Sequence, residues 1–213
     1  ILTDRDGDLW IRSARRLLVL EKNAGRFVPR DKGLPHSSYY GTLSLDREGR
    51  LFVPTDLGLA LGAGVGWLRV DATRGLASDS TSCLLQDREG SIWIGLRGAG
   101  LARWLGHKQW EGWTQAEGLR GDKIWAIVRD ASERLWVGTE QGLNCLSPER
   151  RGWRTWTERQ GLGGNRVQAL AVGPDRAIWV GSFPGGVSRL DPQSGSIRGY
   201  GSESGLTNDR ING

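Results

Sequence analysis

Apolar and polar residues alternate in short runs along the whole chain, and turn-forming residues separate the runs. Residues 81–113 show the pattern clearly, because Asp and Gly frame a tight turn at 87–90 and Gly marks a second turn at 97–100. The runs between these turns predict four short strands, at 81–85, 91–95 and 101–104 and around Trp110 and Trp113.

This unit repeats. An aromatic residue that follows Leu or Ile recurs in five copies, at Trp10, Phe52, Trp93, Trp136 and Trp179, with steps of 42, 41, 43 and 43 residues. A Gly-Leu pair keeps nearly the same spacing, with its glycine at positions 33, 75, 118, 161 and 205. Two markers in phase over five copies indicate a repeat protein with a period near 42 residues.

Four strands of roughly five residues, with turns of similar length, account for this period. Pairs of helices do not, because no ten-residue stretch keeps an apolar helical period free of Gly. The sequence therefore predicts an all-β fold, a β-propeller built of four-stranded antiparallel blades. The aromatic ring on each second strand is expected to be structural and to pack between neighbouring blades.

The motif around the aromatic resembles a known family, the two-component regulator propeller repeat. The copy at 87–95, followed by Gly100-Leu101, carries the resemblance most fully. Further copies begin at Asp4, Asp46, Asp130 and Asp175. Arg12 and Pro54 stand where Gly is usual, and Gly173 replaces the turn Asp, which we interpret as local loop variation.

The resemblance implies a place for the chain in a larger protein. In that family the repeats build seven-bladed propellers, which form the extracytoplasmic sensor region of hybrid histidine kinases and some diguanylate cyclases. Several such sensors respond to polysaccharide breakdown products. The resemblance thus implies a periplasmic location and a small-molecule or oligosaccharide ligand, and it carries over neither a cofactor nor the kinase or cyclase activity of the missing output domain.

The chain starts at Ile1 without a Met and inside a blade, so we expect a fragment of a seven-bladed ring. A five-bladed ring closed by the C-terminal strand is the alternative. The expected blade segments are 1–34, 35–76, 77–119, 120–162 and 163–206, with the start of a next blade at 207–213.

Composition narrows the function further. The formal net charge is +5, but 29 basic and 24 acidic residues are interleaved, so a nucleic-acid partner is not expected. No stretch approaches 18 apolar residues, so this segment is not expected to contact a membrane. Cys83 and Cys145 fall in different strands of different blades, and buried free thiols are expected rather than a disulfide.

Catalytic and metal-binding motifs are missing from the sequence. It contains two histidines, His36 and His107, in different blades, and no Cys or His pair with metal-ligand spacing. The segment 62–66 is Gly-rich, but no Lys-Ser/Thr follows it, so it is not a phosphate loop. We therefore expect no enzyme activity, no metal and no cofactor.

Propellers bind ligands through the loops that lead into the first, innermost strand of each blade. Each such loop follows a Gly-Leu pair and carries polar side chains. Loop candidates for ligand binding are His36, Asp79, Asp122, Lys123, Asn165, Arg166, Asn208 and Arg210. Alternation along the first strand adds Ser82, Trp125 and Gln168 as channel-facing candidates, of which Trp125 has a ring able to stack on a sugar.

Three functional hypotheses remain at this stage. A ligand-binding sensor module is favoured by the repeat class. A lyase of the streptogramin-inactivating type has a similar period but needs channel histidines, and only His36 lies in a suitable loop. A protein-interaction propeller is the third, and it predicts a large exposed apolar patch on one face.

Overall fold

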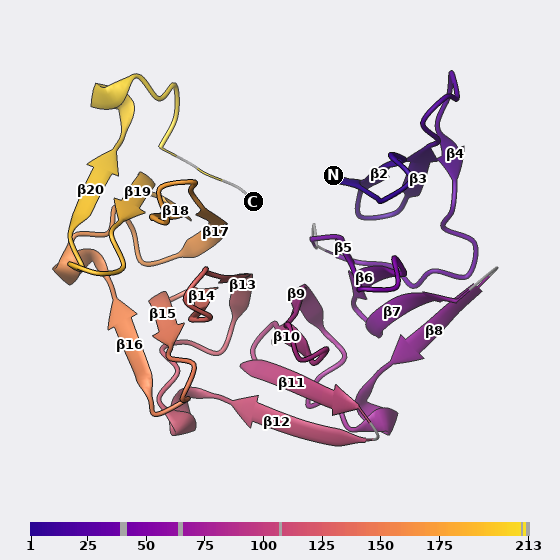
Figure 1. The fold of residues 1–213 in the computed structure, drawn as a ribbon, viewed down its shortest axis with the longest axis horizontal. Coiled ribbons are helices and arrows are strands. Elements are labelled where there is room, and N and C mark those ends of the chain that lie inside the picture. Colours follow the sequence, from indigo (N-terminus) through magenta and orange to yellow (C-terminus); the bar gives the residue numbers. More distant parts are fainter. Residues whose placement is uncertain (39–41, 64–65, 107, 210, 212–213) are drawn as a thin grey trace. The chain divides into compact units, whose positions relative to one another are not determined.

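The computed structural model describes residues 1–38, 42–63, 66–106, 108–209 and 211. Within them, twenty strands form five four-stranded antiparallel sheets, and in each sheet the strands lie side by side in chain order (Figure 1). The predicted all-β class and the four-stranded blades are thereby confirmed.

The chain divides into two compact units, which are described separately. The first contains residues 1–96 and 102–111, and the second contains 97–101 and 112–213. The first unit holds two complete sheets and most of a third. Their strands are β1 (Leu2–Thr3), β2 (Leu9–Arg12), β3 (Leu17–Leu20), β4 (Val28–Pro29), β5 (Ser44–Leu45), β6 (Leu51–Thr55), β7 (Gly58–Ala63), β8 (Gly66–Val70), β9 (Thr81–Gln86), β10 (Ile92–Leu96), β11 (Leu101–Gly106) and β12 (Gln109–Trp113).

The second unit holds the other two sheets. Their strands are β13 (Ile124–Arg129), β14 (Leu135–Thr139), β15 (Gly142–Leu146), β16 (Trp153–Trp156), β17 (Val167–Val172), β18 (Ile178–Ser182), β19 (Gly186–Leu190) and β20 (Ile197–Tyr200). The four strands expected between residues 81 and 113 are all present as β9 to β12. Of the Gly-rich segment 62–66, residues 62 and 63 belong to β7 and residue 66 begins β8, its neighbour in the same sheet, while residues 64 and 65 lie outside the described residues.

Four short 3-10 helices follow the outer strands and were not expected from the sequence. They are η1 (Ala72–Arg74), η2 (Gln115–Glu117), η3 (Glu158–Gln160) and η4 (Ser202–Ser204). The glycine of a Gly-Leu pair ends each one with a left-handed backbone, with φ between 90° and 102°. In four of its five copies the Gly-Leu marker is therefore a helix C-cap, a position that favours Gly because a left-handed backbone strains residues with a Cβ.

The aromatic rings of the second strands lie in the cores. Phe52, Trp93 and Trp136 are at most 1% exposed, as predicted. Trp10 and Trp179 are half-buried. In the second unit Trp136 packs in a cluster with residues of both sheets, which is the packing between neighbouring blades that the repeat predicts.

In four copies the first Asp of the turn before the second strand stabilises that turn. The Asp87 Oδ1 atom accepts the Ser91 N–H at 2.8 Å, and its Oδ2 atom accepts the indole Nε1–H of Trp93 at 2.9 Å. The equivalent carboxylates of Asp4 and Asp130 hold the indoles of their own copies at 2.7 and 2.8 Å. The turn Asp thus has two functions, to close the turn and to satisfy the indole donor.

Two copies depart from this arrangement, and each has a chemical reason. Phe52 has no N–H, and the Oδ2 of Asp46 instead accepts Nε of Arg50 at 2.6 Å. In the fifth copy Gly173 replaces the Asp, and a Cβ there would lie 2.9 Å from the Trp179 Nε1 atom. The sheets form in both cases, so the sequence variations leave the blades intact.

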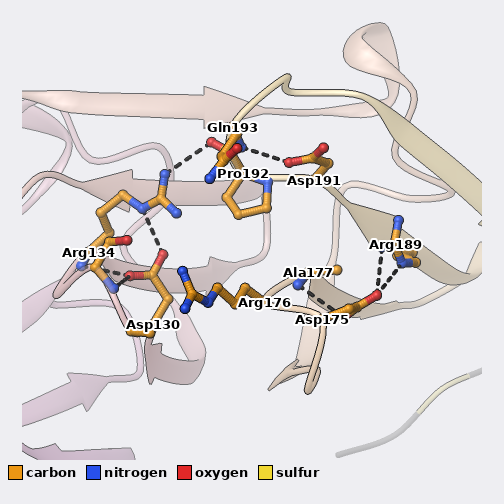
Figure 2. A pocket seen from close by; sticks show the side chains of 11 residues that line it. Asp130, Arg134, Asp175, Arg176, Ala177, Arg189, Asp191, Pro192 and Gln193 are labelled. Atoms are coloured by element: carbon orange, nitrogen blue, oxygen red, sulfur yellow. Dashed lines mark hydrogen bonds and ion pairs between the residues drawn. The ribbon is translucent and has the colours of Figure 1, made fainter.

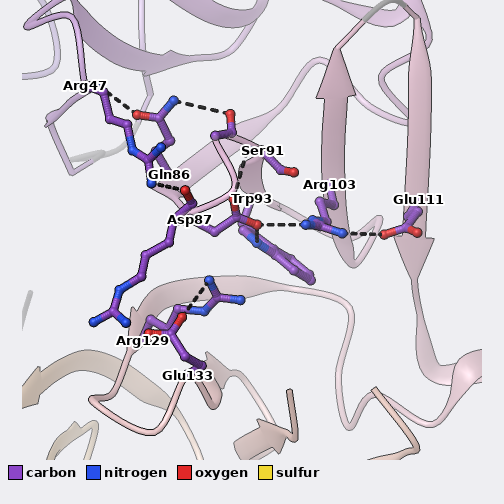
Figure 3. A network of polar contacts seen from close by, with 11 residues as sticks. Arg47, Gln86, Asp87, Ser91, Trp93, Arg103, Glu111, Arg129 and Glu133 are labelled. Carbon is purple, nitrogen blue, oxygen red and sulfur yellow. Dashed lines mark hydrogen bonds and ion pairs between the residues drawn. The ribbon is translucent and has the colours of Figure 1, made fainter. Parts of the chain in front are cut away.

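The most buried ion pair of the described chain lies in the third sheet (Figure 3). Arg103 on β11 donates from Nη2 to Asp87 Oδ2 at 2.9 Å and from Nη1 to Glu111 at 3.2 Å. The Asp87 side chain is 0% exposed and that of Arg103 is 5% exposed. Burial alone would raise the pKa of Asp87, but the hydrogen bonds from Trp93 and Arg103 outweigh it, and the pKa is lowered.

Both cysteines are free and buried, as expected. Burial raises the pKa of Cys83 to about 12 and that of Cys145 to about 12. These thiols stay protonated at neutral pH, so they act as small apolar groups of the core rather than as nucleophiles.

Candidate functional site

The loops into the first strands share one end of their sheets with the hairpins between second and third strands. Antiparallel order places both connections at the same end, and hydrogen bonds join them. The Gly58 N–H donates to the Asp79 carbonyl at 2.7 Å, and the Gly98 and Gly100 N–H groups donate to the Asp122 carbonyl at 3.0 and 2.8 Å. We call this end of each sheet the loop end, and the opposite end, with the turn Asp, the turn end.

Three of the loop candidates have a structural task at the loop end. The Oδ1 atoms of Asp79, Asp122 and Asn165 accept the first N–H of η1, η2 and η3, at 2.7, 2.9 and 2.9 Å. In the last copy Asp209 takes this place and accepts the Ser202 N–H at 2.9 Å, so Asn208 lies one residue before the capping position. Ligand binding by these side chains stays a prediction, and their observed role is to fix the loops.

Each of the three channel-facing candidates is the extra residue of a β-bulge. In β13, Ile124 and Ala126 pair with neighbouring residues of β14, and Trp125 is the extra residue between them. Ser82 in β9 and Gln168 in β17 hold the same bulged position. Bulges re-aim side chains and concentrate at functional sites. The sequence pattern found these three positions as variable ones but gave no sign of the bulge.

The Trp125 bulge is bordered by charged groups of the second unit. The Lys123 ammonium lies 4.7 Å from the centroid of the Trp125 ring, within the range of a cation–π contact. The Lys123 backbone N–H donates to the Glu140 carboxylate at 2.9 Å, which draws the β14–β15 hairpin to this loop. The structure thus brings together an indole face, an ammonium and a carboxylate at one loop end.

The neighbouring sheet repeats this arrangement with other residues. The Arg166 guanidinium lies 5.4 Å from the centroid of the Phe183 ring, again a cation next to an aromatic. Gln168 is half-buried, and its Oε1 atom is buried without a hydrogen-bond partner among the described residues. Ser182, at the end of β18, is fully buried, and its Oγ atom also has no hydrogen-bond partner among the described residues.

The remaining candidates belong to the first unit or lie outside the described residues. His36 is exposed, with Nδ1 at 3.4 Å from Asp56 Oδ2. Ser82 is buried, and its hydroxyl donates to the Gly95 carbonyl at 3.0 Å. Arg210 and His107 lie outside the described residues.

This loop end has the chemistry of a binding site. Rings with adjacent cations, a carboxylate and amide oxygens can stack on a sugar face and hydrogen-bond to its hydroxyl or carboxyl groups. Across the part of the chain that the structure describes, no group of three or more His, Cys, Asp or Glu side chains is placed to hold a metal ion.

Two cavities lie at the turn ends, and the sequence analysis did not identify either. One, of about 180 Å³, is lined by the turns before β14 and β18 together with residues 191–193 (Figure 2). The other, of about 360 Å³, belongs to the first unit and includes Arg5, Arg47 and Arg88, the second residue of three successive turns. The sequence signal for both cavities was the presence of arginines close to the turn Asp residues.

The sheets and their repeat define the class of protein, a β-propeller module. Residues 75–98 and 118–141 match the two component regulator propeller family. Two of the five repeats therefore match the model of the family that the motif predicted. No curated protein sequence matches the chain.

Solved structures have the same fold. The extracellular domain of a hybrid two component system of B. thetaiotaomicron, BT3049, has a TM-score of 0.85 and 18% identity, and the match covers 100% of this chain and 30% of that one. The extracellular domain of BT4673 from the same organism has a TM-score of 0.77 and 23% identity, and the match covers 95% of this chain and 31% of that one.

An enzyme also has this fold. Virginiamycin B lyase from Staphylococcus aureus has a TM-score of 0.72 and 14% identity, and the match covers 93% of this chain and 68% of that one. At these identities the likeness concerns the fold alone. The chain spans about a third of the length of the two extracellular domains. Its described part contains no helix with the length and apolar character needed to cross a bilayer.

Proposed function

We propose that the chain is a ligand-binding module from the extracytoplasmic, periplasmic input region of a bacterial two-component signalling protein, and that its ligand is an oligosaccharide. The observation that carries the proposal is the bulged Trp125 with the Lys123 ammonium 4.7 Å from its ring, at the loop end of a repeat unit of the regulator propeller family. Extracellular domains of two-component systems with the same fold support the setting.

The chemistry of the loop end favours a sugar. An indole face stacks on the apolar face of a pyranose, while charged and amide groups at its edge exchange hydrogen bonds with hydroxyl or carboxyl groups. In the second unit Lys123 supplies such a group from a first-strand loop, Glu140 from a hairpin and Gln168 from the bulge of β17. Arg166 beside Phe183 adds a second cation next to a ring and favours an acidic oligosaccharide.

A general protein-interaction role has less support. It predicts a large exposed apolar patch. The large hydrophobic side chains exposed within the described chain come from several sheets and from the N-terminus: Ile1, Phe27, Leu57, Leu68, Leu105 and Val172. Single exposed hydrophobic residues are normal on a soluble surface and mark no interface.

We further propose that the five blades belong to a seven-bladed ring. The family resemblance implies seven blades, and a chain that spans about a third of two larger solved domains is compatible with a part of one such ring. The unit of ligand recognition in this proposal is the pair of sheets in the second unit, which both carry the bulge and a ring–cation pair.

A thermal-shift screen against acidic and neutral oligosaccharides tests the proposal. A ligand at about 100 times its Kd stabilises the folded state by about 2.7 kcal/mol, which corresponds to a shift of roughly 5–10 °C in Tm. We expect Trp125→Ala to abolish the shift because it removes the stacking surface. Trp153→Ala, on the outer strand β16 of the same sheet, is the matched control and keeps the shift.

Two outcomes would contradict the proposal. An equal shift in wild type and Trp125→Ala places the ligand elsewhere. A folded wild-type sample that no sugar stabilises argues against an oligosaccharide ligand for this module.

A further inference from the structure

We propose that the 180 Å³ cavity at the turn end of the second unit binds a small oxyanion, that is, a carboxylate, sulfate or phosphate group. Asp130, Arg134, Asp175, Arg176, Arg189 and Asp191 contribute its charged groups (Figure 2). The cavity lies at the opposite end of the sheets from Trp125, and the inference is independent of the sugar site.

Two of the three acidic groups of this cavity are largely occupied, and Asp191 accepts two backbone N–H groups at its Oδ1 atom. Asp130 accepts four hydrogen bonds, from the backbone N–H groups of Ser132 and Arg134, from Arg134 Nε and from the Trp136 indole. A carboxylate has about four lone-pair sites, so Asp130 has no acceptor capacity left. Asp175 accepts three hydrogen bonds, from the Ala177 N–H and from Nε and Nη2 of Arg189.

The arginines, in contrast, keep unused donors. Arg134 uses Nε for Asp130 and Nη1 for the Pro192 carbonyl, at 2.7 and 3.0 Å, and its Nη2 has no partner among the described residues. Arg189 uses Nε and Nη2, both for one oxygen of Asp175, and leaves Nη1. These two guanidinium groups are held in place by their own carboxylates and still present N–H groups to a ligand.

Arg176 supplies the strongest observation for the anion site. Its guanidinium makes no hydrogen bond or ion pair with any described residue, and Figure 2 shows its side chain extending from its turn toward Asp130 without a dashed contact. Its backbone has φ of 65°, at the turn position that Gly7, Gly49 and Gly90 occupy in other copies. Arginine there is less favourable than glycine by about 1–2 kcal/mol.

The equivalent turn residue of the preceding copy does have a partner within the protein. Glu133 holds the same turn position with φ of 62°, and its carboxylate pairs with Arg129 at 3.1 Å. Its side chain therefore has a contact within the protein that accounts for it. Arg176 is exposed and has no such contact in the described structure, so its guanidinium is available to a ligand that enters the cavity.

The formal charges of the cavity balance, since three arginines face three aspartates. Net attraction is therefore not the basis of the proposal. The basis is the difference in hydrogen-bonding capacity. Asp130 is saturated and Asp175 is largely occupied, while the neighbouring guanidinium groups have spare N–H groups, which favours a ligand made of acceptors.

The test is an NMR titration of the whole chain with inorganic sulfate, and separately with inorganic phosphate, at millimolar concentration and an ionic strength held constant with chloride. We expect saturable shifts of the Nε–H signals of Arg134, Arg176 and Arg189. Arg176→Gln is expected to weaken the apparent affinity about tenfold or more, since it removes a charged donor. Arg159→Gln, an exposed residue of η3 in the same unit, is the matched control and leaves the affinity unchanged.

Shifts that grow linearly without saturation, or an equal loss of affinity in Arg176→Gln and Arg159→Gln, would overturn the proposal. Trp125→Ala is expected to keep the anion-dependent shifts. Failure of the sugar site and failure of the anion site are therefore separately visible.

Discussion

Replacement of Asp87 by alanine is expected to lower the free energy of unfolding by about 3–5 kcal/mol. The change removes the buried partner of the Arg103 guanidinium, whose side chain is 5% exposed. It also leaves the buried indole N–H of Trp93 and the Ser91 N–H without the acceptors they have in the native turn. Buried donors that lose their partner keep the full cost of their desolvation.

Urea denaturation of the purified chain measures this effect. Asp175→Ala is the matched control, because Asp175 belongs to the turn of the fifth copy but pairs with Arg189 at an exposed position and holds no indole. Exposed pairs contribute little, so the loss in the control is expected to be much smaller. Equal losses in the two variants would show that the Asp–Trp–Arg contacts do not stabilise the third sheet.

The second large effect is expected from Gly100→Ala, with a loss of about 3 kcal/mol or more. Gly100 lies directly before β11 with φ of 76°, and a Cβ there would lie 2.1 Å from the Trp113 carbonyl oxygen. No rotation of a side chain relieves a clash with the backbone of the neighbouring strand, so β11 and β12 have to separate.

Gly33→Ala separates this clash from the cost of the backbone conformation. Gly33 also has φ of 76°, but a Cβ added there would meet no other atom within 4 Å. Only the left-handed backbone is then unfavourable, at about 1 kcal/mol. Thermal or urea unfolding measures both variants. If they lose the same free energy of unfolding, the close strand contact at Gly100 does not add to the cost of the substitution.

The close contact at Gly100 recurs in three of the other four copies. At Gly58, Gly142 and Gly186, each at the start of a third strand, a Cβ would lie 2.4–2.7 Å from a carbonyl oxygen of the fourth strand. Every one of these glycines has a positive φ. The high glycine content therefore has two repeated causes, this close approach and the C-caps of the short helices.

The sequence was sufficient for the fold because the fold depends on repeated, local signals. The aromatic of the second strand and the Asp of the preceding turn lie six residues apart, and in three copies they are joined by a hydrogen bond. Strand order follows from chain order in all five sheets, so no long-range pairing had to be guessed.

The candidate site was harder to predict because its side chains have competing partners. Asp79 and Asp122 have the residue types of ligand-binding groups, yet each accepts a hydrogen bond from the N–H of a short helix that the sequence did not reveal. A three-residue 3-10 helix carries no periodic pattern. The bulge at Trp125 depends on the register between two strands, which composition does not encode.

The turn-end cavity was missed for a related reason. Its ability to bind an anion depends on which donors of Arg134, Arg176 and Arg189 remain unused, and the folding of the turns decides this. From the sequence alone, arginines interleaved with aspartates resemble a solvated surface.

The central claim is that a ligand binds at the loop end of the second unit. Hydrogen–deuterium exchange, with and without the oligosaccharide that stabilises the chain most, tests it directly. The proposed site predicts slower exchange at residues 120–125 and 163–168, where the bulged strands begin. Unchanged exchange in these loops, with protection confined to the turns at 130–134 and 173–177, would contradict the claim.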